Sequence, residues 1–365
     1  MRMLQSQLLI SLISAVALLV PSNRSVAQVN IDDIDVPPEI TEEDVQTYQL
    51  QTAINLASEG TYKPSLSARV IIPAGDMVDG RYKPRRYRLN KSIVVRGGVV
   101  LTSDGRGRRA VRLRWNNVVD NQALLHFVDG HGGGLENVAI AVGQLEPGHK
   151  GDGVIGLLLE SQSSAVFEHF TVDMSGAGAN AVGVKIGKAA KVRNTESTTV
   201  QHFNVSAPKP VVIASGDNLV LSHFDLFVMD NHTNDNLAAV FQNENGYVPP
   251  NVVIGPGSGQ RGDHALAFVG KREKKHGTGD MLTIQNFRWE QGTPKGPAWW
   301  IDVFRFDPAE PKKRLHAIES VVFINCRNSL LGKSKEAYEA FKIPKVGVLS
   351  TEIIGGFHPG KYVAE

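Results

Sequence analysis

One six-residue pattern recurs along most of this chain, and it constrains the fold more than any other feature. Each copy has an apolar residue, a polar residue, Asn or His, and then apolar, polar and apolar residues. Clear copies occupy 135–140, 167–172, 200–205, 221–226 and 284–289, and weaker ones occupy 254–256 and 318–323. The third position, at 137, 169, 202, 223, 256, 286 and 320, advances by 32, 33, 21, 33, 30 and 34 residues. Periods of this length are typical of solenoids.

The third position of the pattern is where we expect the chain to bend. In a straight strand, side chains point alternately to the two faces of the sheet, so apolar residues three positions apart would face opposite ways. Both can face the interior only if the chain turns between them. Asn accepts turn conformations, and Asn and His side chains hydrogen-bond to neighbouring backbone. We therefore interpret His169, His202 and His223 as corner residues and not as catalytic ones.

A further short apolar segment precedes each copy of the pattern. These segments are 124–128, 156–159, 181–186, 210–214, 237–242, 264–269 and 299–306. Three short strands and one sharp polar corner per repeat predict an all-β fold, a single-stranded right-handed parallel β-helix whose coils stack at ~4.8 Å. This domain is expected to span residues 41–365 in roughly nine or ten coils.

The N-terminus has the features of an export signal. Residues 1–27 combine Arg2, the apolar stretch 8–20 and small residues before a cleavage site after Ala27. This order predicts a signal peptide and therefore a secreted or periplasmic protein. The apolar stretch has 13 residues, fewer than the ~20 needed to cross a bilayer, so we expect no stable membrane insertion.

Two segments connect the signal to the repeats. Residues 28–40 are acidic and contain two Pro, which predicts a linker. Residues 42–58 then predict one helix, because Leu50, Ile54 and Ala57 recur at helical spacing after the N-cap candidate Thr41.

Composition excludes several classes of protein. The chain has 365 residues with a formal net charge of +2. Removing the signal would remove Arg2 and Arg24 and no acid, leaving 37 basic and 37 acidic residues, so net charge predicts no nucleic-acid partner. The lone Cys326 cannot form an internal disulfide, and its apolar surroundings indicate a buried thiol. Oligomeric state stays open.

The start of the predicted domain resembles pectate-lyase-like β-helix proteins, a group that includes rhamnogalacturonases and epimerases. The resemblance rests on the segments 51–57, 70–75, 87–89, 93–95 and 98–101. It implies that the helix covers the end of the core and that a polysaccharide lies along the first strand of each coil, between the flanking loops. The insertion 76–86 departs from the family pattern, and we interpret it as a solvated basic loop. The superfamily hosts lyases, hydrolases, epimerases, tailspikes and inactive binders, so the fold implies no single reaction.

Loops between residues 225 and 305 carry the catalytic candidates, which are Asp230, Asp235, Asp263, Lys271 and Arg272. A lyase needs a base for the sugar C5 proton and a cation beside the uronate carboxylate. A hydrolase needs two carboxyl groups, ~5 Å apart for retention or ~6.5 to 9.5 Å apart for inversion. Both reactions stay open, and the three aspartates could instead bind Ca²⁺, so the cofactor is open as well.

Substrate-binding candidates lie on loops and on strands. They are His232, Arg261, Trp299, Trp300, Lys185 and Glu160. The two tryptophans could stack on sugar faces, with one ring outward and one in the core. Lys185 and Glu160 belong to the positions expected to point outward from the first strand of each coil, and the others are His126, Gln242, Glu244 and Asp302. A slip of one residue would turn all of them inward.

The sequence thus favours a secreted carbohydrate-active protein that cleaves a polysaccharide, by β-elimination of a uronate-containing glycan or by glycoside hydrolysis. The alternative is a non-catalytic β-helix that binds glycans or the cell surface. A base and carboxylates placed together would distinguish the enzyme from the non-catalytic binder. The sequence suggests such a set of residues but does not establish it.

Overall fold

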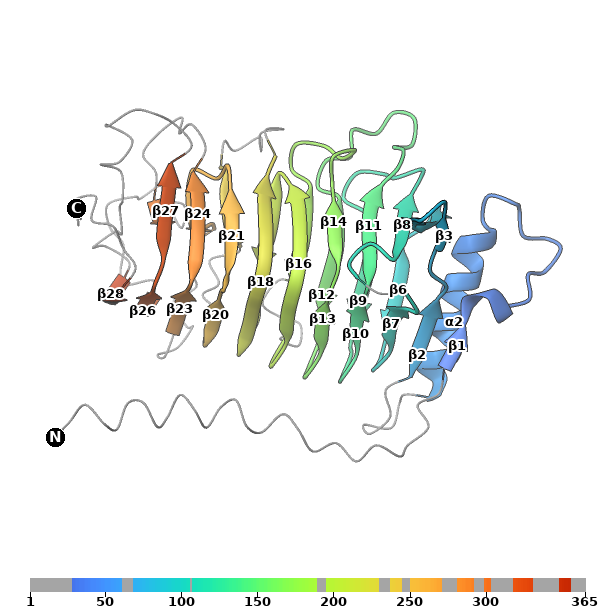
Figure 1. Cartoon of the computed structure of the whole chain (residues 1–365), viewed down its shortest axis with the longest axis horizontal. Helices are drawn as coiled ribbons and strands as arrows, with labels where there is room; N and C mark the ends of the chain where they lie inside the picture. Colours follow the sequence, from blue (N-terminus) through green and yellow to red (C-terminus); the bar gives the residue numbers. More distant parts are fainter. Residues whose placement is uncertain are drawn as a thin grey trace.

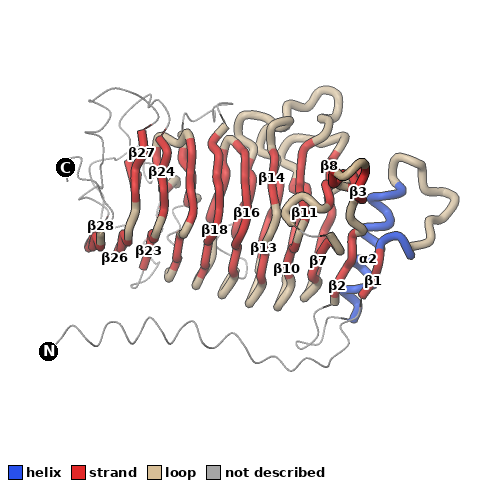
Figure 2. Tube along the Cα trace, viewed as in Figure 1, coloured by secondary structure: helices blue, strands red, loops and turns tan. Residues whose placement is uncertain are grey.

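The computed structural model describes residues 28–60, 68–105, 107–188, 195–229, 237–244, 250–270, 281–291, 299–302, 318–330 and 348–355. These residues form a right-handed parallel β-helix, as the repeat predicts. Its coils are stacked along the long axis of the molecule (Figure 1). Figure 2 shows that helix is confined to one end and that strands build the rest.

One face of the β-helix is an eight-stranded parallel sheet made of the first strand of each coil. Its strands, in order, are β6 (Ile93–Arg96), β9 (Ala123–Val128), β12 (Ile155–Glu160), β15 (Val182–Ile186), β17 (Lys209–Ile213), β19 (Ala239–Asn243), β22 (His264–Phe268) and β25 (Trp299–Asp302). Eight stacked strands enclose seven full turns on this face, fewer than the nine or ten coils predicted, whereas eleven strands stack on the face before the corner.

The other two faces belong to an 18-stranded sheet that bends at the corner of each coil. Before the corner lie β1 (Gln28–Asn30), β2 (Arg69–Ile72), β7 (Val100–Ser103), β10 (Gly134–Glu136), β13 (Val166–Glu168), β20 (Val252–Ile254), β23 (Met281–Gln285), β26 (Ile318–Ile324) and β28 (Val348–Ile354). After it lie β5 (Arg85–Leu89), β8 (Val111–Trp115), β11 (Val138–Val142), β14 (Thr171–Asp173), β21 (Gly257–Gln260), β24 (Phe287–Gln291) and β27 (Arg327–Leu330). The long strands β16 (Thr199–Ala207) and β18 (Leu219–Val228) run through the corner.

The corner residues adopt the left-handed backbone conformation. Their φ angles lie between 47° and 60°, at Asn137, His169, His202, His223, Asn286 and Asn325. This conformation turns the chain sharply, and Asn is among the few residues besides Gly that adopt it readily. Pro256 takes the same register position, opposite His223. In the last coil the corner is Asn325 and not Ser320, because β26 pairs Ile284 with Phe323, so that prediction was five residues too early.

The three corner histidines stack on one another. The His169 and His202 ring centroids are 4.7 Å apart at an interplanar angle of 5°, and those of His202 and His223 are 4.4 Å apart at 22°. They lie on consecutive coils, at equivalent positions. The interpretation of these histidines as corner residues is confirmed.

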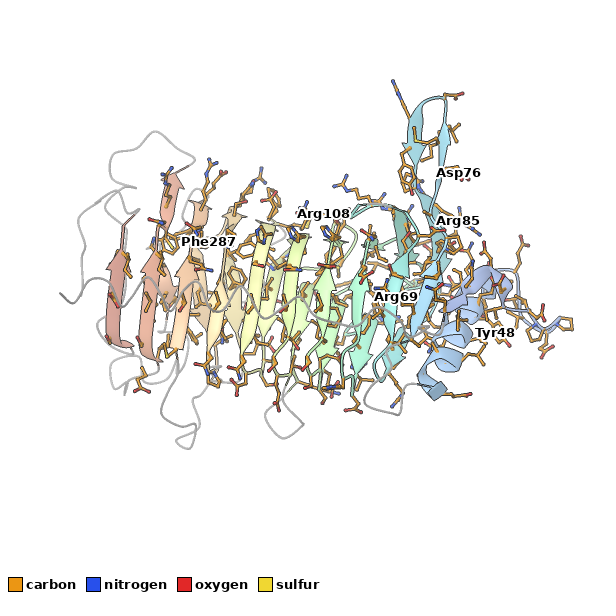
Figure 3. All side chains as sticks on the ribbon, turned by 60° about the horizontal axis from the view of Figure 1, so that its bottom comes forward. Tyr48, Arg69, Asp76, Arg85, Arg108 and Phe287 are labelled. Carbon is orange, nitrogen blue, oxygen red and sulfur yellow. The ribbon has the colours of Figure 1, made fainter. Side chains whose placement is uncertain are left out.

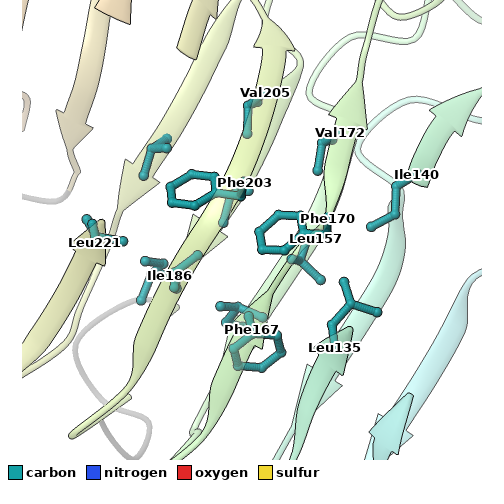
Figure 4. Packing of buried hydrophobic residues seen from close by; sticks show 14 of the residues in the cluster. Leu135, Ile140, Leu157, Phe167, Phe170, Val172, Ile186, Phe203, Val205 and Leu221 are labelled. Carbon is teal, nitrogen blue, oxygen red and sulfur yellow. The ribbon is translucent and has the colours of Figure 1, made fainter. Parts of the chain in front are cut away.

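The residue after each corner enters the core. Phe170 stacks on Phe203 at 5.3 Å between ring centroids, and Phe203 packs on Phe224 at 5.7 Å. Figure 4 shows the Phe170 and Phe203 rings side by side inside the β-helix. Gly257 takes the next position, where a Cβ would lie 2.4 Å from the Phe224 ring, and this space lets Phe224 reach Phe287 at 5.6 Å. Cys326 ends the column as a buried thiol with its pKa raised by burial to about 11, as expected for a structural Cys.

Helix α2 (Val45–Gly60) covers the N-terminal end of the core, close to the predicted 42–58. Leu50, Ala53, Ile54 and Ala57 are its buried face. Gln51 also pairs with the edge strand β6, since its Nε2 donates to the Val94 carbonyl and its Oε1 accepts from the Val94 amide, both at 2.9 Å. A side chain thus replaces the missing neighbouring strand and blocks further pairing at this edge.

Residues 28–40 are not the free linker that the sequence predicts. β1 pairs in parallel with β2, and the short 3-10 helix η1 (Ile31–Asp33) buries Ile31 in the core. The acidic, Pro-containing sequence around Ile31 gives no indication that this side chain is buried. The predicted signal peptide, 1–27, lies outside the described residues. In the described part of the chain, no helix is long and apolar enough to cross a membrane.

The insertion at 76–86 forms a hairpin rather than a loop. β3 (Asp76–Val78) and β4 (Arg81–Lys83) pair antiparallel around a turn at Asp79 and Gly80, whose φ angles are 52° and 71°. The hairpin projects from the body of the helix (Figure 3), and Arg85 and Arg86 already belong to β5.

We expect corner substitutions to test the role of the left-handed conformation. Asn286→Val should lower the free energy of unfolding by about 1–2 kcal/mol, because a β-branched residue fits this backbone poorly. Asn286→Gly, which accepts the same φ freely, should lose less. Denaturant unfolding of both variants provides the measurement, and a Val variant as stable as the Gly variant would contradict the account.

The histidine stack should make stability depend on pH. The pKa of His202 is lowered from 6.5, first by burial and then by His223, His169 and Arg108. The unfolded chain therefore binds a proton that the folded chain resists, so stability is complete above pH 6.5 and falls as the pH drops toward the lowered pKa.

Replacing His169, His202 and His223 together by Asn, the residue at other corners, should reduce the loss of thermal midpoint between pH 7.5 and pH 5. His149→Asn, outside the stack, is the control and should leave the pH dependence as it is. An equal loss in the triple variant and the unaltered protein would exclude the stack as its source.

Candidate functional site

The outer face of the eight-stranded sheet carries two rows of side chains that come from successive coils. The register places the first outer row at Val94, His126, Leu158, Lys185, Val212, Gln242, Ala267 and Asp302. The second outer row lies two residues further on and includes Arg96, Val128, Glu160, Ala214 and Glu244. The intervening residues, such as Phe127, Leu159 and Ile186, are buried in the core. The outward positions expected from the sequence are thus in the correct register.

His126, Glu160 and Lys188 are in direct contact on this face. The His126 Nε2 lies 2.9 Å from the Glu160 Oε2, and the Lys188 Nζ lies 3.5 Å from the same oxygen. The Glu160 side chain is only 8% exposed. A buried carboxylate needs such partners, because an unpaired one would cost several kcal/mol.

Burial lowers the pKa of His126 from 6.5. The attraction of Glu160 opposes this effect, whereas Lys188 and Arg96 add to it. The imidazole is therefore neutral at pH 7. With a carboxylate as partner, Nε2 carries the hydrogen, which leaves Nδ1 as the basic nitrogen.

A second ion pair lies further along the sheet. The Lys185 Nζ lies 2.6 Å from the Glu244 Oε2, with both side chains about one-fifth exposed, at 20% and 23%. The two residues are two coils apart, on β15 and just after β19. Lys185 reaches across β17, where the small side chains of Val212 and Ala214 leave room.

The two glutamates are too far apart to act as a pair. Glu160 and Glu244 occupy equivalent positions three coils apart, which corresponds to ~14 Å at the spacing of parallel strands. Lys185 and Lys188 come from the coil that follows Glu160. This face therefore presents two cations between two carboxylates.

The C-terminal part of the sheet buries further polar groups. Gln242 and Asp302 belong to the first outer row and are 2% and 4% exposed. The His264 Nε2 lies 3.6 Å from the Asp302 Oδ2, again inside the protein. Polar burial on an outward face continues over most of the sheet, from Glu160 to Asp302.

Several sequence candidates lie outside the described residues, namely Asp230, His232, Asp235, Lys271 and Arg272. Their grouping stays a prediction. Asp263 is described directly before β22, and its backbone amide donates to the Ala238 carbonyl. Arg261 places its guanidinium 4.6 Å from the centre of the Phe227 ring, on the face after the corner.

The two tryptophans differ in placement. Trp300 is fully buried and packs edge-on against Trp289 and Phe287, so it is the ring expected in the core and cannot stack on a sugar. Two apolar residues in succession at the start of a first strand both turn inward, as Trp300 and Ile301 do. The Trp299 backbone lies in β25, and its side chain is outside the described residues.

Sequence reasoning missed Lys188 and Arg96. Both lie at the end of a first strand or directly after it, and the apolar pattern gives no signal there. The only available signal was the position of Lys188 after the turn residue Gly187, whose φ is 76°. Among the described residues, no group of three His, Cys, Asp or Glu side chains could hold a metal ion. The Ca²⁺ prediction depends on Asp230 and Asp235, which lie outside that part of the chain.

No protein-family model matches the chain, and no curated protein matches it in sequence. Solved structures do match in shape. PfbA, a surface adhesin of Streptococcus pneumoniae, aligns with a TM-score of 0.48 and 10% identity over 90% of this chain and 92% of that chain. An alginate lyase from Paenibacillus aligns with a TM-score of 0.43 and 9% identity over 84% and 97%. A 1,3-alpha-1,4-beta-D-galactose-4-sulfate-3,6-anhydro-D-galactose-2-sulfate 4 galactohydrolase aligns with a TM-score of 0.46 and 13% identity over 84% and 70%.

The chain is a parallel β-helix by its own strand pairing. At these identities the likeness extends to the fold alone, as members of such a superfold differ widely in chemistry. The site of this β-helix must therefore be judged from its own residues.

The contacts of His126 predict opposite effects of two substitutions. Glu160→Gln should lower the pKa of His126 further, because it removes the attraction that stabilises the imidazolium. Lys188→Met should raise it, because it removes a repulsion. Titration of the His126 ring by NMR measures both, and Glu168→Gln on another face is the control. Shifts in the same direction in the two variants would refute the proposed arrangement.

Proposed function

We propose that the protein is a secreted polysaccharide lyase that binds an acidic glycan along the outer face of the eight-stranded sheet. The single observation that carries the proposal is a neutral imidazole, His126, fixed by a buried carboxylate, Glu160, with cations nearby. A chain of sugars laid across the coils would meet a new outward side chain every ~4.8 Å.

The residues have separate roles in this reaction. His126 Nδ1 takes the C5 proton of a uronate residue, and the electron pair of that C–H bond forms the C4–C5 double bond. The bond from C4 to the glycosidic oxygen breaks, and that oxygen leaves with a proton from water. Lys188 and Arg96 both influence the imidazole electrostatically, one from each side of its coil. They would bind the uronate carboxylate and so stabilise the carbanion character at C5.

Elimination is favoured over hydrolysis by the separation of the carboxylates. Hydrolysis needs two carboxyl groups ~5 Å or ~6.5 to 9.5 Å apart. Glu160 and Glu244 are ~14 Å apart along the stack of coils, and each is bound to a lysine. A base with neighbouring cations is the arrangement that a lyase needs.

The proposal predicts loss of activity in His126→Gln. The protein should convert a polyuronate such as polygalacturonate or alginate to a product that absorbs through its new double bond. His126→Gln should abolish that absorbance and keep the thermal midpoint. The rate of the unaltered protein should rise with pH and level off below pH 6.5, because burial lowers the pKa of the base.

The matched control is His149→Gln. His149 is also an imidazole beside a carboxylate, 3.4 Å from Asp120, but its side chain is 37% exposed and it lies outside the eight-stranded sheet. It should keep full activity. Reducing ends without absorbance would indicate hydrolysis, and glycan binding without product would indicate a binding protein; either result would overturn the lyase proposal.

A further inference from the structure

Positive charge is concentrated in the first coils of the β-helix. Residues 76–114 contain 12 Lys and Arg and three Asp, a balance of +9. The whole chain carries +2, so the rest carries 2 − 9 = −7. The first coils therefore carry a net positive charge and the rest of the chain a net negative one.

Four arginines in this region form a compact block on the face after the corner. Arg86 and Arg88 of β5 lie in register with Arg112 and Arg114 of β8. The residues between them are buried, so all four side chains point outward. Neighbours are ~4.8 Å apart between coils and ~7 Å apart along a strand. We call these four residues the arginine block.

Two arginines of the block, Arg86 and Arg88, lack the carboxylates that accompany other arginines in the described part of the chain. Arg69 forms a two-pronged contact with Glu136, and Arg85 forms one with Asp32. In the block, Arg112 has Asp173 at 3.7 Å and Arg114 donates to the Gly143 carbonyl. No carboxylate of the described residues forms an ion pair with Arg86 or Arg88. Like charges directly opposite one another destabilise a sheet, so the fold alone gives no reason for this placement.

The hairpin β3–β4 extends the charge beyond the sheet. Arg81 and Lys83 are exposed on it, and the hairpin rises beside Arg85 in Figure 3. Tyr82 anchors it, because its hydroxyl accepts from the Gly75 amide at 3.0 Å and donates to the Ala110 carbonyl at 2.7 Å. The hairpin is thus held in place next to β8.

Basic side chains extend beyond the block over the next strands. On β11, Ala139 and Ala141 continue the two rows of arginines and are each 5% exposed. Arg112 reaches across β11 to Asp173 at 3.7 Å, and Arg108 donates to Asn204 on β16, so positive charge continues along this face.

We propose that the arginine block and the hairpin residues Arg81 and Lys83 form a docking surface for a linear anionic polysaccharide. Guanidinium groups bind sulfate or carboxylate through two parallel hydrogen bonds, and a regular array of them suits a polymer with regularly spaced anions. The arginine block belongs to the 18-stranded sheet and the hairpin forms a two-stranded sheet of its own, whereas the proposed base His126 and its partner Glu160 belong to the eight-stranded sheet. Binding at the block therefore does not depend on the proposed reaction.

Two other polyanions fit the surface less well. Single-stranded nucleic acid binds through stacking on several aromatic rings, and Tyr82 is the exposed ring of the described patch. Insertion into an anionic membrane would bring the hairpin into the lipid first; the hairpin exposes Met77 and Val78, but its turn carries the charged Asp79, flanked by Arg81. A carbohydrate polyanion requires neither rings nor an apolar tip.

The test compares two double variants of the full mature chain. Arg86→Ser with Arg88→Ser removes two charges from the block. Arg288→Ser with Arg327→Ser removes two charges from the same outward row at the far end of the same sheet, which makes it the matched control. Binding is measured with heparin, polygalacturonate and neutral dextran over a range of salt concentrations, and thermal unfolding checks that both variants fold.

The block variant should weaken binding of at least one acidic polymer by about tenfold and reduce the slope of log K against log salt by roughly two, about one for each lost charge. The control should change both by much less, and dextran should not bind. Heparin and polygalacturonate distinguish sulfate from carboxylate recognition. Equal losses in the two variants, or no binding of either acidic polymer, would overturn the proposal.

Two further probes address the other partners. Tighter binding of a single-stranded oligodeoxynucleotide, or of phosphatidylglycerol vesicles, than of either acidic polymer would assign the surface to that partner and overturn the proposal. The block variant should keep turnover of short uronate oligosaccharides, and His126→Gln should keep heparin or polygalacturonate binding. The experiments therefore distinguish a wrong docking proposal from a wrong lyase proposal.

Discussion

The left-handed corner is the constraint on which the rest of this structure depends. In six of the described coils a single residue with φ between 47° and 60° bends the chain, so that the apolar residues before and after it both enter the core. Because the bend recurs at equivalent positions, each coil lies in register on the previous one. The same registry that stacks Phe170 on Phe203 also stacks His169 on His202. Interior and surface are therefore both built as columns.

Because equivalent residues of successive coils lie above one another, the stacking determines which side chains can meet in a site on this fold. A functional group of side chains comes from successive strands at ~4.8 Å intervals and not from one contiguous motif. His126 and Glu160 come from adjacent strands, and Lys185 reaches Glu244 only across a third. Burial of such charges is tolerable because each has a partner, and the resulting pairs hold the imidazole in a defined tautomer.

Much of this fold could be predicted from the sequence, because the corner pattern is local. The first strands, the corners up to Asn286 and the helix over the core end all follow from residue order. The last corner was misplaced because the spacing from Asn286 to Asn325 is 39 residues, longer than in any other coil. The acidic residues around Ile31 gave no sign that its side chain is buried. Which of the two tryptophans turns inward depends on a bend that no local sequence pattern marks.

The site was harder to predict for a different physical reason. Outward positions were identified correctly, but their partners lie one to three coils away, and contact depends on what occupies the coils between. Lys185 meets Glu244 because Val212 and Ala214 are small, a condition set by residues that carry no chemistry themselves. Lys188 follows a turn and belongs to no strand, so its contact with Glu160 follows from neither periodicity nor register.

The outer face of the eight-stranded sheet and the arginine block differ more clearly in how their charges are paired than in their net charge. On the eight-stranded sheet, two lysines lie between two carboxylates, and each lysine is close enough to one carboxylate to neutralise it. A ligand of such a surface must compete with these existing pairs. In the described part of the chain, Arg86 and Arg88 of the arginine block have no such partners, although Arg69 and Arg85 nearby have them. A surface that retains uncompensated like charges gains most from an anion that arrives from outside, and an extended polymer satisfies several of them at once.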